Sequence, residues 1–171
     1  GREPELLDRL RTRIRPLMRR RTKSEVAADL PEKQVQVLDI AMNPQHERIY
    51  SRQLQRERQR VLGLLDDPEA NRIAILSSLT RLRQLSLDPA LVDDEHAEVG
   101  SAKIDALVEH LTELRREGHR ALVFSQFTRF LRRVEARLER EGIPTAYLDG
   151  TTTNRPDVIR GWRNGDQTAF L

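Results

Sequence analysis

The sequence predicts an α/β protein in which a mainly helical segment precedes a parallel sheet with flanking helices. Up to about residue 100, apolar residues recur mostly at the three- and four-residue spacing of helices. Beyond that point, helical patterns alternate with short apolar runs at 121–124, 145–148 and 168–171. Strands that are separated by helices in this order form a parallel sheet with right-handed crossovers.

The first 42 residues contain one helical pattern and one strand pattern. Apolar residues recur at helical spacing up to Pro16, which must break or kink a helix there. A dense positive cluster follows at residues 19–23. Residues 35–42 alternate imperfectly between apolar and polar side chains, which predicts one strand.

A helical hairpin is predicted next. Asn43 and Pro44 can open a helix over about 44–65, and its many Gln and Arg residues should leave most of its surface in water. A second helix is expected from Pro68 to about Leu87, with a clear apolar stripe. The stripe consists of Ile73, Leu76, Leu79, Leu82 and Leu85.

Residues 92–100 are predicted to form an exposed acidic linker. They include Asp94-Glu95-His96-Ala97, which imitates the Asp-Glu element that holds magnesium in ATPases. In such enzymes that element follows a long buried strand and works with an upstream Gly-x-x-x-x-Gly-Lys-Ser/Thr loop. The sequence contains no such loop, so we assign no magnesium site to the linker.

The helices of the second half have recognisable start and stop signals. Ser101 can cap a helix that Gly118 ends, and Thr128 can cap another that ends at Gly142. Pro156 can open a third, short helix. The apolar residues expected to face inward are Ile104, Leu107, Val108, Leu111, Leu114, Leu131, Val134, Leu138, Val158, Ile159 and Trp162. Three short strands bury little core, so we expect further strands to complete the sheet and the sequence to be a piece of a longer protein.

The composition excludes several functions. The sequence has no cysteine, which excludes disulfides, thiolate metal sites and cysteine nucleophiles. Its four histidines lie far apart without ligand spacing, so no metal site is expected. No apolar run approaches the length of a membrane span and the first residues lack a signal-peptide pattern, which predicts a cytoplasmic protein.

The net charge of +3 is unevenly distributed along the chain. Residues 1–60 carry 15 basic side chains against 9 acidic ones, residues 61–100 carry 3 against 8, and residues 101–171 carry 12 against 10. An acidic middle between two basic ends indicates segments with different roles.

Polar side chains follow two of the predicted strands. They are Ser125, Gln126 and Thr128 after the first strand, and Asp149, Gly150, Thr151, Thr152, Thr153 and Asn154 after the second. In an open parallel sheet, ligands bind outside the carboxyl ends of the strands, and the helix N-termini there attract anions. Arg155 adds a fork-shaped donor suited to phosphate. These residues predict a phosphate-binding surface, although Ser, Thr and Asn at such positions can also serve only as caps and turn formers.

Asp149 could also be a catalytic carboxylate. No partner acid or base lies at a recognisable spacing from it, so a role in forming or orienting the turn is favoured, and no catalytic residue is assigned to the chain.

Four stretches of the chain carry a family resemblance. In order, they are LMRRRTKSEVAADLPEKQVQVLDIAMNPQHERIY, LTRLRQLSLDPALV, SAKIDALVEHLTELRREGHRALVFSQFT and YLDGTTTNRPDVIRGWRNGDQTAFL. Together they resemble the SWI/SNF-type ATPases of helicase superfamily II, particularly the bacterial members. The resemblance covers nearly the whole chain, and the VFSQFT and LDGTT blocks at their mutual distance are its most specific part.

Members of that family have two RecA-like lobes, with ATP and Mg²⁺ in the cleft between them and double-stranded DNA across both. The resemblance implies that residues 1–42 are the tail of the first lobe, that 43–100 form a helical protrusion and acidic linker, and that 101–171 begin the second, helicase C-terminal lobe as a partial RecA-like sheet. It implies contacts with the DNA backbone by Ser125, Gln126, Thr128, Asp149, Gly150, Thr151, Thr152 and Arg155. In the positive cluster, Arg20, Arg21 and Lys23 are candidates for phosphate contact, with a solvated charge run as the commoner alternative.

The resemblance thus implies part of an ATP-dependent double-stranded DNA translocase or remodeller. The nucleotide-binding loop, the magnesium carboxylates and the arginine-bearing last motifs of the family are not in this sequence, so the chain alone is expected to be inactive in ATP hydrolysis and to bind no cofactor well. A DNA-bound protein such as RNA polymerase is a candidate partner, and a nucleoid-associated location is expected. The competing interpretation is a non-enzymatic α/β module that binds a protein or RNA.

One turn departs from the family. Ser86-Leu87-Asp88-Pro89 stands where the family often has a Cys-Asn-His-Pro sequence. We therefore assign no role to that turn from the sequence.

Overall fold

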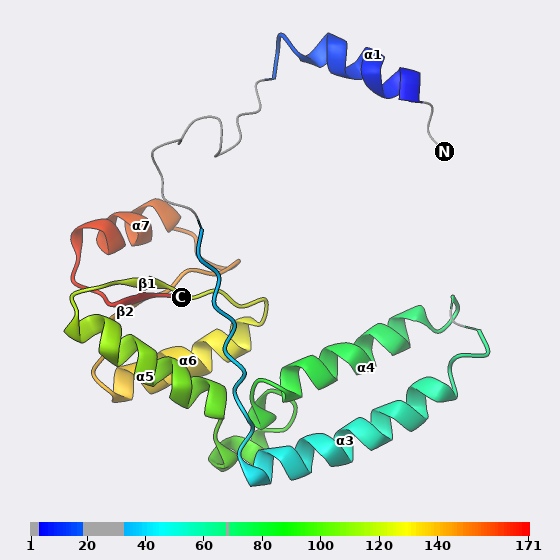
Figure 1. Ribbon diagram of the computed structural model, residues 1–171, viewed down its shortest axis with the longest axis vertical. Coiled ribbons are helices and arrows are strands. Elements are labelled where there is room, and N and C mark those ends of the chain that lie inside the picture. The colour runs from blue at the N-terminus through cyan, green and yellow to red at the C-terminus, as the bar shows by residue number, and fades with distance from the viewer. Residues whose placement is uncertain (1–3, 19–32, 68) are drawn as a thin grey trace. The chain divides into compact units, whose positions relative to one another are not determined.

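The computed structural model describes residues 4–18, 33–67 and 69–171 (Figure 1). The chain divides into two units, residues 1–38 and 39–171. In the first unit, α1 spans Pro4–Ile14 and ends just before Pro16, as the sequence predicts. No helix within the described ranges is long and apolar enough to cross a membrane.

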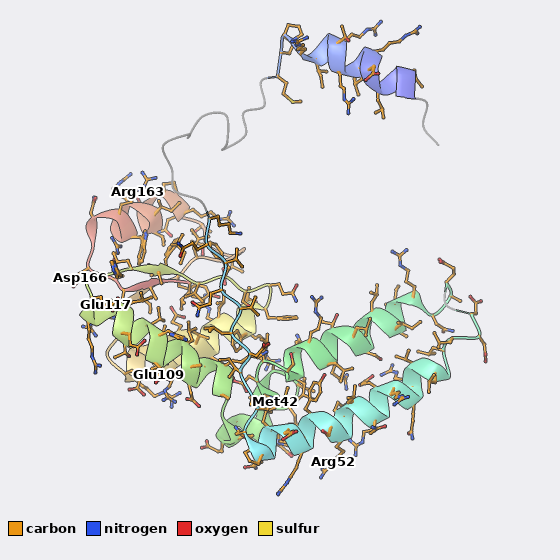
Figure 2. The ribbon with its side chains drawn as sticks, in the orientation of Figure 1. Met42, Arg52, Glu109, Glu117, Arg163 and Asp166 are labelled. Atoms are coloured by element: carbon orange, nitrogen blue, oxygen red, sulfur yellow. The ribbon has the colours of Figure 1, made fainter. Side chains whose placement is uncertain are left out.

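The predicted strand at 35–42 does not form. Residues 33–43 adopt neither helix nor strand, and Val35 and Val37 are largely exposed. A strand needs a neighbouring strand to bind its amide and carbonyl groups, and the described residues provide none here. The segment leads to Met42 at the entrance to the next helix (Figure 2).

The predicted helical hairpin is confirmed. It consists of α3, which spans Pro44–Leu62, and α4, which spans Arg72–Leu85, and the two helices lie side by side (Figure 1). Asn43 caps α3, because its side-chain oxygen accepts a hydrogen bond from the His46 amide at 2.8 Å.

Helix α4 begins later than predicted, and its apolar stripe lies largely at the surface. The Asp67 carboxylate accepts a hydrogen bond from the Ala70 amide at 3.1 Å, which holds a turn ahead of the helix. Ile73 and Leu76 are 81% and 52% exposed, whereas Leu85, at the end of the helix, is buried. Most of the stripe therefore faces away from the core.

The linker contains two short 3₁₀ helices, η1 at Pro89–Leu91 and η2 at Asp94–Val99. Asp88 and Asp93 cap them, because each side chain accepts a hydrogen bond from the amide two residues further on, at 2.9 and 3.0 Å. Most residues of η2 are exposed, as predicted for the linker, but the segment has defined local structure.

Three helices follow, α5 at Ala102–Arg116, α6 at Thr128–Arg140 and α7 at Arg155–Asn164. Ser101 caps α5 as predicted, since its hydroxyl oxygen accepts a hydrogen bond from the Ile104 amide at 3.3 Å.

Glycines end α5 and α6, as predicted. Gly118 and Gly142 have positive φ angles of 74° and 65°. The amide after each glycine reaches back to a carbonyl in the last turn of the helix, at 2.8 and 2.9 Å.

The predicted cap of α6 is wrong. Thr128 is the first helical residue, and Phe127 occupies the cap position without a side-chain hydrogen bond to the helix. Ser125 forms the local bond instead, because its hydroxyl oxygen accepts a hydrogen bond from the Phe127 amide at 3.1 Å.

The sheet contains β1 at Ala121–Leu122, β2 at Thr145–Ala146 and β3 at Ala169–Phe170, all parallel and in the order β1-β3-β2. All three strands, including the central β3, are shorter than the predicted runs. Figure 1 shows α5 and α6 on one side of the sheet and α7 on the other. This arrangement is a partial RecA-like α/β fold, as predicted.

The core lies where α5 and α6 pack on the sheet. Its buried members are Leu91, Ile104, Val108, Leu111, Phe130, Leu131, Val134, Leu138, Ile143, Ala169 and Leu171. On the other side, Trp162 of α7 stacks on Phe170 with ring centroids 5.3 Å apart, but Ile159 is 38% exposed, so its predicted inward position is wrong. A sheet of three short strands is too narrow to cover the whole face of α7.

Candidate nucleic-acid interface

The two predicted polar loops lie at the same edge of the sheet. The Val123 amide donates to the Phe170 carbonyl and the Leu148 amide donates to the Leu171 carbonyl, both at 2.8 Å. The carboxyl ends of β1 and β2 therefore flank the end of β3. Because neighbouring strands lie about 4.8 Å apart, the two loops begin roughly 10 Å from each other.

The first loop, residues 123–127, presents Gln126 to solvent. Gln126 and Thr128 are exposed, and neither side chain forms a hydrogen bond with the described part of the chain. Ser125 is half-buried, and its hydroxyl accepts the Phe127 amide. Ser125 thus shapes the loop, while Gln126 and Thr128 can bind an external group.

Asp149 organises the second loop. One of its carboxylate oxygens accepts hydrogen bonds from the Thr151 amide and hydroxyl, at 2.8 and 2.6 Å, and the Asp149 amide donates to the Thr152 hydroxyl oxygen at 3.0 Å. The hydrogen bonds from Thr151, helped by the charge of Arg132, lower the pKa of Asp149 to about 2. The Asp149 carboxylate is therefore ionised and bonds to residues of its own loop. This favours a role in orienting the turn over a catalytic role.

Arg155 is anchored to the same loop. Its Nε donates to the Thr152 carbonyl at 3.3 Å, and its Nη2 donates to the Asp149 carbonyl at 3.1 Å. The side chain is exposed, so the remaining N–H groups of the guanidinium can donate to a ligand in solvent. Gly150 beside it is also exposed, and nothing lies within 4 Å of the Cβ position that a side chain would occupy there.

Helices α6 and α7 begin at this edge without a side-chain cap. Phe127 and Asn154 occupy the cap positions, and neither side chain bonds to the first turn. By contrast, Asn43 and Ser101 cap α3 and α5. Unsatisfied first-turn amides and the dipole of an uncapped helix attract anions. Helix α6 offers such amides, whereas in α7 Pro156 has no N–H and the Asp157 amide already donates to the Asn154 carbonyl at 3.0 Å.

Arg132 belongs to this edge, although the sequence analysis missed it. It lies on α6, one turn after Thr128, and its guanidinium stacks over the Tyr147 ring at 3.6 Å. Its nitrogens lie 3.4 Å from Asp149 and 3.0 Å from Glu135. The first loop leads into α6, so Arg132 links the two loops through that helix. The only signal in the sequence was the four-residue spacing from Thr128 to Arg132, which places both residues on the same face of a helix.

Other predicted groups are not brought to this edge. Arg20, Arg21 and Lys23 fall outside the residues that the structure describes. Within the described ranges, no group of three or more His, Asp or Glu side chains could hold a metal ion.

Both halves of the sequence match family models. Residues 2–91 match the SNF2-related domain, and residues 102–171 match the helicase conserved C-terminal domain. The chain belongs to the SNF2 family. The resemblance inferred from its motifs is confirmed.

Relatives of this SNF2-family chain come from animals, fungi and bacteria. It is 32% identical over 99% of its length to a chromodomain-helicase-DNA-binding protein 1-like of Danio rerio and 27% identical over 99% to the ISWI chromatin-remodeling complex ATPase ISW1 of Saccharomyces cerevisiae. It is also 26% identical over 95% of its length to an uncharacterized ATP-dependent helicase of Mycoplasma pneumoniae. The chain spans only 15% to 17% of the length of these relatives.

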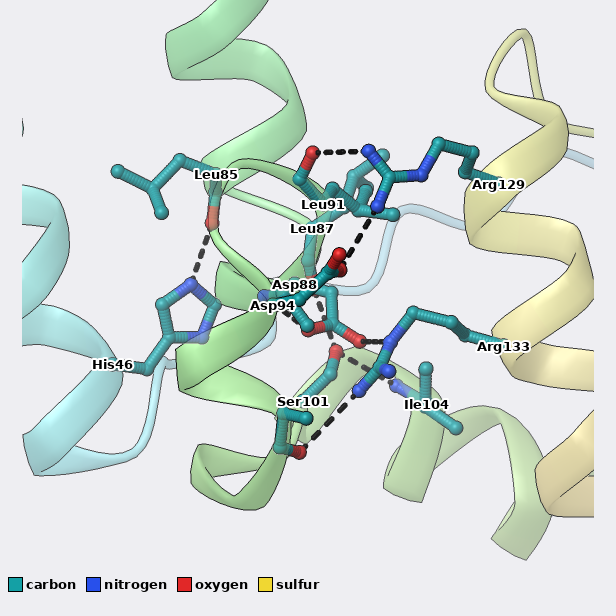
Figure 3. A network of polar contacts seen from close by, with 12 residues as sticks. His46, Leu85, Leu87, Asp88, Leu91, Asp94, Ser101, Ile104, Arg129 and Arg133 are labelled. Atoms are coloured by element: carbon teal, nitrogen blue, oxygen red, sulfur yellow. Dashed lines mark hydrogen bonds and ion pairs between the residues drawn. The ribbon is translucent and has the colours of Figure 1, made fainter.

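The two regions that match SNF2-family models meet at a polar junction (Figure 3). Asp88 is fully buried there, and its carboxylate accepts hydrogen bonds from the Ala90 amide at 2.9 Å and from Arg133 Nε at 2.6 Å. The Ser101 hydroxyl donates to the Leu87 carbonyl at 2.6 Å. The turn to which the sequence analysis assigned no role therefore joins the hairpin to α6.

Two further contacts extend this junction (Figure 3). Arg129 of α6 donates to the Leu91 carbonyl at 3.2 Å and pairs with Asp94 at 3.0 Å. His46 of α3 is buried, and its Nε2 lies 2.6 Å from the Leu85 carbonyl oxygen. Because a carbonyl oxygen only accepts, Nε2 carries a hydrogen and donates the hydrogen bond. The junction thus connects α3, α4, the linker and α6.

Proposed function

We propose that the chain is part of an ATP-dependent double-stranded DNA translocase and remodeller, to which it contributes contacts with the DNA backbone. Membership of the SNF2 family and the helicase and remodelling ATPase names of its relatives support this class. The observation that carries the DNA-binding role is the meeting of two polar loops, Arg155 and two uncapped helix starts at one edge of the sheet.

In this proposal the residues of the edge have two roles. Gln126, Thr128, Arg155 and the first-turn amides of α6 bind phosphate oxygens directly. The hydroxyls and carboxylate that bond within the loops hold those donors in place, and the glycine lets a backbone approach closely. The supporting residues are Ser125, Asp149, Gly150, Thr151 and Thr152. Backbone contacts of this kind carry no sequence information, which suits a protein that must move along any DNA.

The division of the chain follows from the same proposal. Residues 1–42 are the tail of the first RecA-like lobe, 43–100 the helical protrusion with its linker, and 101–171 the first part of the second lobe. The whole protein binds ATP and Mg²⁺ between its lobes. Because this chain has no Gly-x-x-x-x-Gly-Lys-Ser/Thr loop, the pure chain should turn over ATP no faster than a blank. That the whole protein acts on a DNA-bound protein such as RNA polymerase, and that it associates with the nucleoid, stay predictions.

The test is fluorescence anisotropy of a labelled 20-base-pair duplex, of the order of two helical turns, titrated at several salt concentrations. We expect weak binding, independent of sequence, that falls with salt. The Gln126→Ala, Arg155→Ala double variant should bind more weakly and show a smaller salt slope, by about 0.9 for each lost phosphate contact.

The matched control is an Asn164→Ala, Arg116→Ala double variant, which removes one amide and one guanidinium at the opposite edge of the sheet. These two residues end α7 and α5, just before the chain enters β3 and β1. Equal loss in both variants, or no binding by the unmodified chain, would count against the interface. Preferential binding of single-stranded RNA of the same length would favour the RNA-binding alternative.

A further inference from the structure

We propose that α3 carries a second contact with the DNA backbone, formed by Arg48, Arg52, Arg56 and Arg60. This proposal rests on the proposed function, since it takes duplex DNA as the ligand of the whole protein. The four residues, called the arginine ladder below, are all exposed. Figure 2 shows Arg52 projecting outward from the helix.

The ladder is regular. Residues four apart in a helix share a face and lie about 6 Å apart along the axis, so the ladder extends about 18 Å from Arg48 to Arg60. Each step also turns by about 40°, which makes the row a shallow spiral. Duplex DNA carries one phosphate charge per about 1.7 Å of its axis, so a duplex beside α3 presents about ten phosphates over this length. The supply of phosphates therefore exceeds the number of arginines.

The ladder works against the stability of its own helix. Like charges four residues apart repel each other, and α3 contains three such pairs. The acidic residues of α3 are Glu47 and Glu57, and Glu57 is buried. Within the described residues, no ladder arginine lies within 4 Å of a carboxylate oxygen. An external anion would offset this repulsion.

The arginines of α6 show the contrasting arrangement. Four of its five arginines pair with the chain's own carboxylates, Arg129 with Asp94, Arg132 with Glu135 and Asp149, Arg133 with Asp88, and Arg137 with Asp105 and Glu141. The fold thus pairs most arginines of α6 internally and leaves those of the ladder for a ligand.

A recess of about 290 Å³ lies beside the middle of the ladder. Arg52 and Arg56 line it together with Arg81 of α4 and with Asp93 from the linker. Arg81 lies 3.7 Å from the buried carboxylate of Glu57. Glu57 offsets the charge of Arg81 and Asp93 offsets one more, so the three guanidinium groups leave an excess of one positive charge at the recess, which suits a phosphate group.

The side chains around the ladder favour nucleic acid over an acidic protein. Gln45, Gln55 and Gln59 are exposed on the same side of the helix as the ladder. Protein interfaces have apolar or aromatic anchors at their centre and few charges there. A polar face with regularly spaced arginines instead matches the charged backbone of a duplex.

The test compares an Arg52→Gln, Arg56→Gln variant with the unmodified chain in the same duplex titration. The control is an Arg58→Gln, Arg72→Gln variant, which removes the same charge from the same hairpin. Around α3, Arg58 is turned by about 120° from Arg52 and about 160° from Arg56. Arg72 opens α4, and both control residues are exposed. Gln is nearly as good a helix former as Arg, so both variants should stay folded, which circular dichroism will check.

We expect the ladder variant to bind at least about fivefold more weakly at 50 mM salt, with a salt slope lower by about 2, and the control to bind within about twofold of the unmodified chain. A ladder variant that binds like its control overturns the proposal. Polyglutamate that displaces the duplex more effectively than unlabelled duplex does would overturn it in favour of an acidic protein.

The two proposals can fail separately. If the Gln126→Ala, Arg155→Ala variant binds like its own control while the ladder variant loses affinity, the sheet edge fails and the ladder stands. The reverse pattern removes the ladder and leaves the proposed function intact. Absence of any duplex binding overturns both.

Discussion

The Asp88 carboxylate and the Arg133 guanidinium, which are 45 residues apart in the sequence, form a 2.6 Å contact that fastens the helical hairpin to α6 (Figure 3). Asp88 is fully buried, and its other oxygen caps η1, so both carboxylate oxygens have donors. A buried carboxylate is tolerated only when it is paired and hydrogen-bonded. The position of the hairpin on the rest of the chain therefore depends on this pair.

Replacing Asp88 by Ala should destabilise the chain strongly. The change leaves Arg133 Nε and the buried Ala90 amide without their acceptor. Loss of one partner of a buried pair costs about 3–5 kcal/mol, and the partial exposure of Arg133 reduces the expected cost to about 2–4 kcal/mol. Urea denaturation measures the free energy of unfolding of both proteins.

Asp94→Ala is the matched control for that experiment. Asp94 pairs with Arg129 on the same helix, but its side chain is 88% exposed. Exposed pairs contribute about 0–1 kcal/mol, so this variant should unfold nearly like the unmodified chain. Similar losses in the two variants would show that the buried pair does not hold the junction.

The pKa of Asp149 gives a pH-dependent prediction. Its folded value of about 2 lies below the ordinary 3.8, so its contribution to stability is full above about pH 4 and disappears as the pH falls through about 2. The stability difference between the unmodified chain and an Asp149→Asn variant should therefore shrink over that range. Thermal unfolding followed from pH 6 to pH 2 measures the difference. A constant difference across the range would mean that Thr151 does not hold the charged carboxylate.

Local signals predicted the parts of the fold whose partners are close in sequence. Asn43 with Pro44 marks the start of α3, and Gly118 and Gly142 mark two helix ends. Each of these residues acts on backbone groups within a turn of itself. The shared sheet edge of the two polar loops followed from the order of strands and helices, because parallel strands place their carboxyl ends together.

Features that depend on distant partners were not predictable. Residues 35–42 have a strand pattern, but a strand also needs a neighbour, and local pattern does not supply one. The role of Asp88 depends on Arg133, and nothing near Asp88 in the sequence indicates a buried charge. The stripe of α4 is amphipathic, yet Ile73 is exposed, because periodicity shows which residues share a face and not whether anything covers it.

Two glycines should respond to alanine in opposite directions. Gly142 ends α6 with a φ of 65°, where a Cβ is strained, so Gly142→Ala should cost about 1 kcal/mol or more. Gly161 lies inside α7 without a positive φ, and nothing lies within 4 Å of its Cβ position. Gly161→Ala should therefore raise stability by about 0.5–1 kcal/mol. Denaturant titration of both variants measures the change in the free energy of unfolding. Changes of the same sign in the two variants would contradict the backbone argument.

Arg132 should act on DNA binding by positioning the loops rather than by touching phosphate. Its guanidinium is occupied by Asp149, Glu135 and the Tyr147 ring. Arg132→Gln should lower duplex affinity a few-fold while the salt slope stays the same, whereas Arg155→Gln should lower the slope by about 0.9. Since the Arg132 side chain is 54% exposed, the free energy of unfolding should change by less than about 1 kcal/mol.

Arg132→Lys separates the two roles of this side chain. Lysine keeps the charge but cannot bridge two carboxylates and stack on the tyrosine at the same time. If Arg132 positions the second loop, lysine will not restore affinity, and the salt slope will remain that of the unmodified chain. Recovery of affinity by lysine, together with a reduced slope in Arg132→Gln, would instead make Arg132 a direct phosphate contact and move the centre of the interface onto α6.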